Sequence, residues 1–124
     1  MLHLKSILDQ LVEPGNVNIS VPEFFNFGFD VVDTWATEKS TTAFVSVNRT
    51  ASVIKHHSFA ELSENSNRFA NVLRRLGAKK EECAIVILPR VPAWYEVIIG
   101  CIKAGVVAMP GTNLLTAKDI EYRI

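Results

Sequence analysis

Apolar and polar residues recur along the chain with periods that change from segment to segment, and each period predicts a helix or a strand. Residues 58–76 have the clearest helical period. Ser58 and Glu61 are spaced as a capping box, in which each side chain binds a free backbone N–H at the helix start. Gly77 suits the helix end because glycine readily adopts a positive φ. The predicted buried face consists of Phe59, Leu62, Ser66, Phe69, Leu73 and Leu76.

Two short, uniformly apolar runs, residues 83–88 and 106–109, flank a segment with helical spacing. Such runs are typical of strands that are buried on both faces of a parallel sheet. Pro89 and Pro110 should end these strands, because proline cannot donate a ladder hydrogen bond. The helix between them is bracketed by Pro92 and Gly105. The pattern therefore predicts a right-handed strand–helix–strand unit.

The first third of the chain has weaker signals. Residues 22–37 begin with a proline that suits a helix start. Their apolar stripe consists of Phe24, Phe25, Phe29, Val32 and Trp35. Two β-rich runs, residues 42–48 and 52–59, are separated by turn-forming residues and predict a hairpin. Residues 1–12 have a faint helical period, and residues 13–18 are typical of a linker.

Together these elements predict an α/β fold with an N-terminal helix, a β-hairpin, and then a helix and a parallel strand–helix–strand unit. Thr116 and Asp119 should cap a last helix that starts shortly before Ile124. Two parallel strands and one hairpin form a thin sheet, so we expect part of a larger domain. Helices suited to a larger sheet would leave apolar surface exposed, which predicts marginal folding of these residues alone.

Composition and charge exclude several classes of partner. Thirteen basic and thirteen acidic side chains cancel, so no net field predicts nucleic-acid binding. The charged cluster at residues 74–82 favours a solvated helix end over a phosphate-binding patch. No apolar run is long enough to span a membrane, and the first residues do not resemble a signal for secretion. Cys83 and Cys101 are expected to be reduced core thiols, as in a reducing compartment.

The residues show no catalytic motif. There is no G-x-S-x-G elbow, the six glycines are scattered, and no glycine-rich phosphate loop occurs. His56 and His57 are adjacent on a predicted strand, so their rings should point to opposite faces and make a poor metal pair. The carboxylates fall mostly on predicted helix surfaces, where a solvated role is expected. We therefore predict neither a catalytic residue nor a metal ligand.

Geometry still points to a ligand site. In open α/β sheets, ligands bind beyond the carboxyl ends of the strands, here residues 89–91 and 110–113. Arg90 suits a carboxylate or phosphate, but a structural arginine that binds loop carbonyls is the favoured alternative. Gly111 would let a backbone approach a ligand, or would simply form a turn.

Three strings of residues resemble one family. They are "FAELSENSNRFANVLRRLG", "AIVILPRVPAWYEVIIGCIKAGVVAMPGT" and "LTAKDIEYRI". They resemble the N-terminal region of the medium-chain acyl-CoA synthetases, which belong to the AMP-forming adenylating superfamily. "VPEFFNFGFDVVDTWA" is similar to the opening helix of that family, so the resemblance covers residues 21–124 and leaves 1–20 as an extension or linker. It is weakest over residues 37–55.

This resemblance implies the incomplete first part of the large N-terminal domain of an adenylating enzyme. The implied reaction joins a medium-chain carboxylic acid to ATP, giving an acyl-adenylate, and then transfers the acyl group to CoA, with Mg²⁺ assisting. The residues that carry out this chemistry in the family have no counterpart before Ile124. The chain alone is therefore expected to be inactive and to bind no cofactor tightly, in the cytoplasm or the mitochondrial matrix.

The resemblance also suggests where CoA would lie. In the medium-chain enzymes, a glutamine two positions beyond the threonine of Pro-Gly-Thr is associated with CoA. The matching residue is Leu114, which has no amide, so a possible CoA edge consists of Thr112, Asn113 and Leu114. Asn113 could replace the glutamine only if the loop shifts. Ala93 also departs from the family, which commonly has glutamate there, and the usual Gly-Asp before the first parallel strand is missing.

Two other interpretations remain. The chain could be a truncated, non-catalytic product that acts as a protein-interaction module or associates with itself through its apolar faces. A flavodoxin-like nucleotide-binding module is disfavoured, because the glycine-rich loop is missing.

Overall fold

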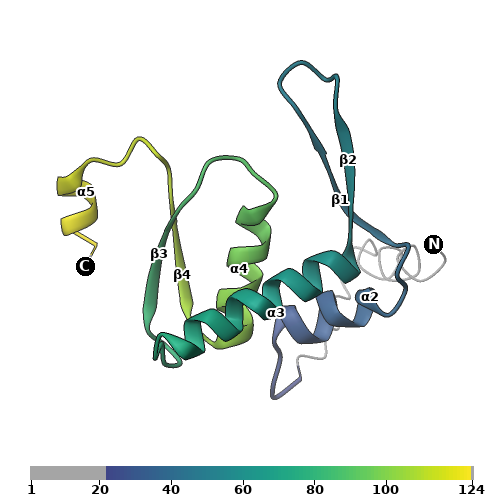
Figure 1. Cartoon of the computed structure of the whole chain (residues 1–124). Helices are drawn as coiled ribbons and strands as arrows, with labels where there is room; N and C mark the ends of the chain where they lie inside the picture. Colours follow the sequence, from purple (N-terminus) through teal and green to yellow (C-terminus); the bar gives the residue numbers. More distant parts are fainter. Residues whose placement is uncertain (1–21, 124) are drawn as a thin grey trace, which may run out of the picture.

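The computed structural model describes residues 22–123, so the helix predicted at 1–12 and the linker at 13–18 lie outside the described residues. The first element is a π-helix, η1. In chain order the elements are η1 (Phe27–Asp33), α2 (Thr34–Ala36), β1 (Thr42–Val47), β2 (Ile54–Ser58), α3 (Phe59–Arg75), β3 (Cys83–Ile87), α4 (Ala93–Ala104), β4 (Val107–Gly111) and α5 (Ala117–Glu121) (Figure 1).

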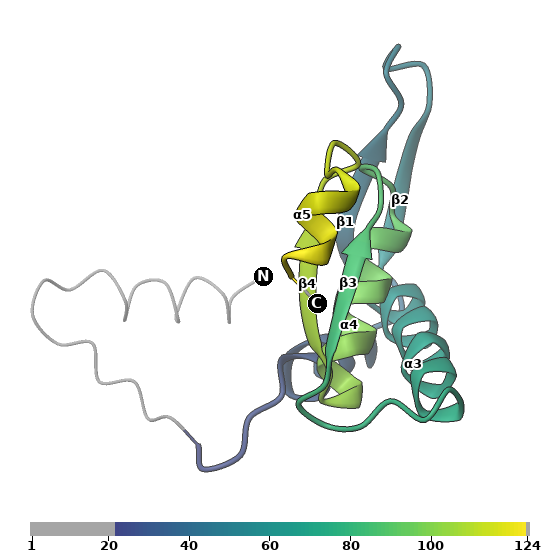
Figure 2. The same cartoon turned by 90° about the vertical axis from the view of Figure 1, so that its left-hand side faces the viewer.

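The predicted hairpin and the predicted strand–helix–strand unit are both confirmed. β1 pairs with β2 antiparallel, and β3 pairs with β4 parallel with α4 between them in the chain. The α4 helix lies on one side of the β3–β4 sheet and α5 lies on the other, while the hairpin rises away from both (Figures 1 and 2). The fold is thus α/β, with two separate two-stranded sheets.

Helices α3 and α4 cross at a point where both have small residues. A Cβ atom at Gly100 would lie 2.8 Å from the backbone oxygen of Ser66, so only glycine fits this crossing. Ser66 is completely buried there. The neighbouring core consists of Val32, Leu62 and Ile99, with Phe44 and Phe59 packed against it. The crossing therefore joins η1, α3, α4 and the hairpin into one hydrophobic core.

Both predicted capping boxes are confirmed. In α3, the Glu61 N–H donates to Ser58 Oγ at 3.1 Å, and the Ser58 N–H donates to Glu61 Oε2 at 2.9 Å. The second bond stabilises the carboxylate, and it is the main reason that the pKa of Glu61 lies below its usual value. Thr116 and Asp119 form the same arrangement at the start of α5.

The prediction that a helix begins at Pro22 is wrong about where the helix starts. The helical backbone begins at Phe27, where the Asn26 side chain accepts a hydrogen bond from the Gly28 N–H at 2.9 Å. Of the predicted apolar stripe, Val32 is 1% exposed, whereas Phe24 is 84% exposed. The spacing of apolar residues predicts the whole stripe. Within residues 22–123, however, no helix or strand covers its first aromatic residues.

The strands predicted to be buried on both faces are buried at few positions. Val86 is buried, and the other residues of its face range from half-buried to exposed. The opposite, outer face of the sheet is half-buried or exposed throughout. This outer face consists of Cys83, Ile85, Ile87, Val107 and Met109. The prediction of a core thiol is therefore wrong for Cys83, which is exposed, and confirmed for Cys101, whose burial raises the pKa of its thiol. The last predicted face residue of α3, Leu76, is also exposed.

Pro110 lies inside β4 instead of ending it. Val107 pairs with Cys83, and its N–H donates to the Glu82 carbonyl at 2.8 Å, toward β3. Because backbone direction alternates along a strand, the nitrogen of Pro110 faces the other edge. In the described part of the chain that edge of β4 has no partner strand, so the missing N–H breaks no ladder bond.

Candidate functional site

A groove lies where the sequence places a ligand, beyond the carboxyl ends of β3 and β4. Its volume is about 890 Å³. β1 forms one wall, and the loops after β3 and β4 together with the first turn of α4 form the other. The lining residues are Phe44, Val45, Ser46, Val47, Leu88, Pro89, Arg90, Val91, Pro92, Trp94, Tyr95, Pro110, Gly111, Thr112, Asn113 and Leu114.

Aromatic contacts hold the hairpin against the start of α4 and so shape the groove. The Phe44 ring lies 4.8 Å from the Tyr95 ring and 4.5 Å from the His57 ring, measured between centroids. Trp94 meets Tyr95 edge to face at 5.3 Å. Ser46 Oγ lies 2.9 Å from His57 Nε2, which fixes the buried imidazole. This wall is mostly apolar.

The two adjacent histidines face opposite sides of β2, as predicted. His57 is buried beneath Phe44, whereas His56 is exposed. No group of three or more potential metal ligands occurs within residues 22–123.

The three residues of the predicted CoA edge all line the groove. Thr112 Oγ1 accepts a hydrogen bond from the Leu114 N–H at 3.1 Å, which closes a tight turn just after β4. Leu114 is 84% exposed. Gly111 has an ordinary negative φ, so the turn does not require glycine. A Cβ at Gly111 would lie 2.5 Å from Leu115 Cδ1, so this glycine makes room for a leucine.

Arg90 lines the same groove and is exposed. The sequence favours a structural arginine that binds loop carbonyls. Within residues 22–123, however, its guanidinium makes neither a hydrogen bond nor an ion pair. The structural interpretation of Arg90 is therefore wrong for the described residues. The charged cluster at residues 74–82 is solvated as predicted, apart from half-buried Ala78.

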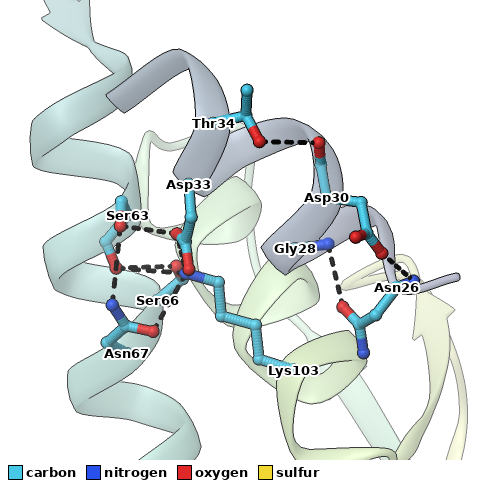
Figure 3. Close-up of polar contacts among 9 residues, drawn as sticks. All are labelled: Asn26, Gly28, Asp30, Asp33, Thr34, Ser63, Ser66, Asn67 and Lys103. Atoms are coloured by element: carbon cyan, nitrogen blue, oxygen red, sulfur yellow. Dashed lines mark hydrogen bonds and ion pairs between the residues drawn. The ribbon is translucent and has the colours of Figure 1, made fainter. Parts of the chain in front are cut away.

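Sequence reasoning missed a polar cluster between η1, α3 and α4, in which Lys103 is buried and its side-chain partners are half-buried (Figure 3). Lys103 Nζ lies 2.5 Å from Asp33 Oδ1 and 2.9 Å from Asn67 Oδ1. A third contact reaches the Ser63 carbonyl at 3.5 Å, and Ser63 Oγ donates to Asp33 at 2.6 Å. These contacts use all three donors of the ammonium group, so the cluster is a closed structural network and not a site for a substrate.

One signal could have revealed this network. Lys103 follows Ile99 by four residues and therefore shares its buried helix face, where a lysine needs an acidic partner. Gly28 also belongs to the arrangement, because a Cβ there would collide with the lysine stem. The partner, Asp33, lies far away in the sequence, and local periodicity cannot identify it.

Comparison with known proteins agrees with this fold. The family model described as AMP-binding enzyme matches residues 32–124. The acyl-coenzyme A synthetase ACSM3 of Pongo abelii, a mitochondrial protein, is 39% identical over 113 residues, which are 86% of this chain and 19% of that protein. Human ACSM2A, also a mitochondrial acyl-coenzyme A synthetase, is 44% identical over 111 residues, which are 84% of this chain and 19% of the relative.

Solved structures show the same arrangement. A benzoate CoA ligase from Burkholderia xenovorans LB400 superposes with a TM-score of 0.65 at 32% identity, covering 81% of this chain and 19% of that one. A fatty acid AMP ligase from Legionella pneumophila gives a TM-score of 0.68 at 18% identity, covering 77% and 17%, and shows the fold alone.

The chain thus spans about a fifth of the length of these relatives. None of the helices within residues 22–123 has the length and apolar character needed to cross a membrane. The fold, the family match and the level of identity agree, and the chain belongs to the AMP-binding enzyme family, with acyl-coenzyme A synthetases among its relatives.

Proposed function

We propose that this chain provides the first strands and helices of the large domain of an AMP-forming acid–CoA ligase. The observation that carries the proposal is the identity of about two residues in five with acyl-coenzyme A synthetases, over 86% of the chain. A CoA ligase is also among the similar solved structures above 30% identity. In this proposal, residues 21–124 form part of the domain, and residues 1–20 are an extension or linker.

The substrates of the whole enzyme are a medium-chain carboxylic acid, ATP and CoA. ATP with Mg²⁺ activates the carboxylate by adenylation, and the CoA thiol then accepts the acyl group. The 124 residues contain no loop rich in serine, threonine and glycine that ends in lysine. The chain alone is therefore inactive, and its contribution is scaffold together with one edge of the CoA site at residues 112–114.

The groove supports this role for the 112–114 edge. These residues stand at the carboxyl end of β4, where ligands of open α/β sheets bind. Leu114 has no amide, so its contact with CoA would be apolar. The backbone N–H groups and Asn113 are the remaining polar groups there. The names of the relatives favour the mitochondrial matrix over the cytoplasm as the compartment.

Two measurements test the proposal. Reading the coding sequence in frame beyond Ile124 should reveal the phosphate-binding loop of the family, and an immediate stop codon would contradict a complete enzyme. The purified 124-residue chain, given ATP, Mg²⁺ and octanoate, should release no pyrophosphate above the level without octanoate. Acid-dependent pyrophosphate release would show that the inactivity assigned to the chain is wrong.

A truncated product that acts as a protein-interaction module is the second candidate. Its support is the apolar surface that the described residues leave open: Phe24 is 84% exposed, and Val107 on the outer sheet face is 48% exposed. An in-frame stop codon together with stable binding to a full-length relative would favour this candidate over the enzyme.

A further inference from the structure

The groove has one charged side chain on an otherwise uncharged lining. Among the residues that line it, only Arg90 carries a charge, and no carboxylate is present to neutralise it. The rest of the lining is largely apolar or aromatic, and it includes Val47, Leu88 and Trp94. A lone guanidinium beside such walls is complementary to a ligand with an anionic group on an apolar or aromatic body.

We propose that Arg90 binds a phosphate group of CoA and that the CoA molecule runs along the groove from Arg90 to the edge at residues 112–114. This inference rests on the function proposed above. The loop after β3 then has a binding role. In the structural alternative, this loop would serve only as scaffold.

The position of Arg90 supports this role in two ways. It follows Pro89 just beyond the carboxyl end of β3, and residues 112–114 follow the carboxyl end of β4, so the two loops lie at the same end of the sheet (Figure 1). Its guanidinium has no partner within residues 22–123. A structural arginine would instead donate hydrogen bonds to loop carbonyls.

A phosphate fits this site better than the carboxylate of the acid substrate. Arg90 is exposed, so its charge is well solvated, and a singly charged carboxylate gains little from one such contact. The phosphates of CoA carry more charge and present several acceptor oxygens, which the planar guanidinium can bind in pairs. The pantetheine arm would then face the uncharged part of the lining.

Nuclear magnetic resonance can test this with an internal control. The Trp94 indole lines the groove, whereas the Trp35 indole packs on Phe59 at 5.9 Å and is not part of the lining. CoA should shift the Trp94 indole resonance and leave that of Trp35 in place, with weak affinity. Pantetheine, which lacks phosphate, and octanoate, which supplies a carboxylate, are titrated into the same samples.

Arg90→Gln should weaken CoA binding at least about fivefold, which converts to about 1 kcal/mol, and should leave pantetheine binding unchanged. The CoA affinity of Arg90→Lys should fall between that of the wild type and that of Arg90→Gln, because lysine keeps the charge and loses the paired geometry. The matched control is Arg49→Gln at the exposed hairpin turn, which should bind CoA as the wild type does.

Four results would overturn the inference. They are no CoA-dependent shift of Trp94 in the wild type, equal CoA binding by Arg90→Gln, equal loss in Arg49→Gln, and a loss in Arg90→Gln confined to octanoate. Equal binding by wild type and Arg90→Gln would refute only the role of Arg90. The ligase proposal fails separately, through the downstream reading frame and the pyrophosphate measurement.

Discussion

Lys103 shows how a single residue can set the geometry of three elements. Its side chain is 1% exposed and that of Asp33 is 32% exposed, so the pair is buried at one end and open to water at the other. A buried ammonium is tolerated only when its donors are used, and here Asp33, Asn67 and the Ser63 carbonyl accept all three. η1 is thereby bound to both α3 and α4.

We expect Asp33→Ala to lower the free energy of unfolding by about 2–3 kcal/mol. That is somewhat less than the roughly 3–5 kcal/mol for a fully buried pair, because Asp33 is partly solvated. The loss arises because the buried amino group of Lys103 would lose its carboxylate partner. The shift of the urea midpoint, followed by circular dichroism at one fixed chain concentration, measures this effect.

Two variants make that measurement specific. Glu64→Ala removes an i,i+4 pair with Arg68 whose side chains are 63% and 72% exposed, and it should cost no more than about 0.5 kcal/mol. Adding Lys103→Met to Asp33→Ala should restore part of the loss, since it removes the stranded charge. Equal losses in Asp33→Ala and Glu64→Ala would refute the structural role of the buried pair.

Residue roles were predictable only where the signal is local. The capping residues Ser58 and Thr116 were found because their partners are three residues away. The Lys103–Asp33 pair joins residues 70 positions apart, and no sequence period encodes such a distance. For Arg90 the sequence favours a structural role because arginines commonly bind loop carbonyls, but within residues 22–123 its guanidinium forms no such bond.

At the scale of elements, α3 depends on its capping box. The Ser58 N–H holds the pKa of the Glu61 carboxyl below its usual value. A group whose pKa is lower in the folded state stabilises the fold above its unfolded pKa, and this contribution disappears as pH falls through the folded pKa. The capping box should therefore stabilise the fold at neutral pH, and this stabilisation should weaken in acid.

Glu61→Gln tests this pH dependence, because the amide oxygen can still accept the bond but does not titrate there. We expect the wild type to be more stable than Glu61→Gln at pH 7, and the difference to shrink as pH falls below the usual glutamate range and to vanish once pH is below the lowered pKa of Glu61. Urea midpoints of both chains across this range give the comparison. A difference that stays constant with pH would show that the ionised carboxylate contributes nothing.

Elements with strong local signals were predicted to within a few residues, and those shaped by their neighbours were not. The period and caps of α3 and the turn residues of the hairpin determine these elements locally. η1 is a π-helix that begins at Phe27, held by the Asn26 cap and by Lys103 from α4. That arrangement arises from tertiary contacts, so the apolar stripe alone predicted a helix that starts too early.

At the scale of the molecule, the described residues leave apolar surface uncovered. The outer face of the β3–β4 sheet includes Val107, 48% exposed, and Ile87, 37% exposed. Apolar faces of this kind favour contact with other chains or with further parts of the same domain. The sequence predicted the parallel strands correctly but overestimated their burial. An apolar run indicates that a strand is suited to burial, and it does not indicate which element covers the strand.

We expect the 124-residue chain to associate as its concentration rises through the micromolar range and to bind an apolar dye such as anilinonaphthalene sulfonate. Ile87→Thr combined with Val107→Thr should reduce both effects, whereas Val53→Thr, an exposed valine before β2 in the hairpin, should change them less. Sedimentation and dye fluorescence provide the measurements. A monomer with a sharp two-state melt at micromolar concentration would contradict this prediction.

The proline within β4 also affects how such association can occur. Along the open edge of β4, Ala108 presents an N–H outward, but Pro110 presents none, so an added strand finds its ladder interrupted after one donor. Two copies of the chain are thereby hindered from pairing edge to edge along this part of β4. Pro110 thus acts as a gatekeeper against aggregation, leaving the sheet face as the route for contact.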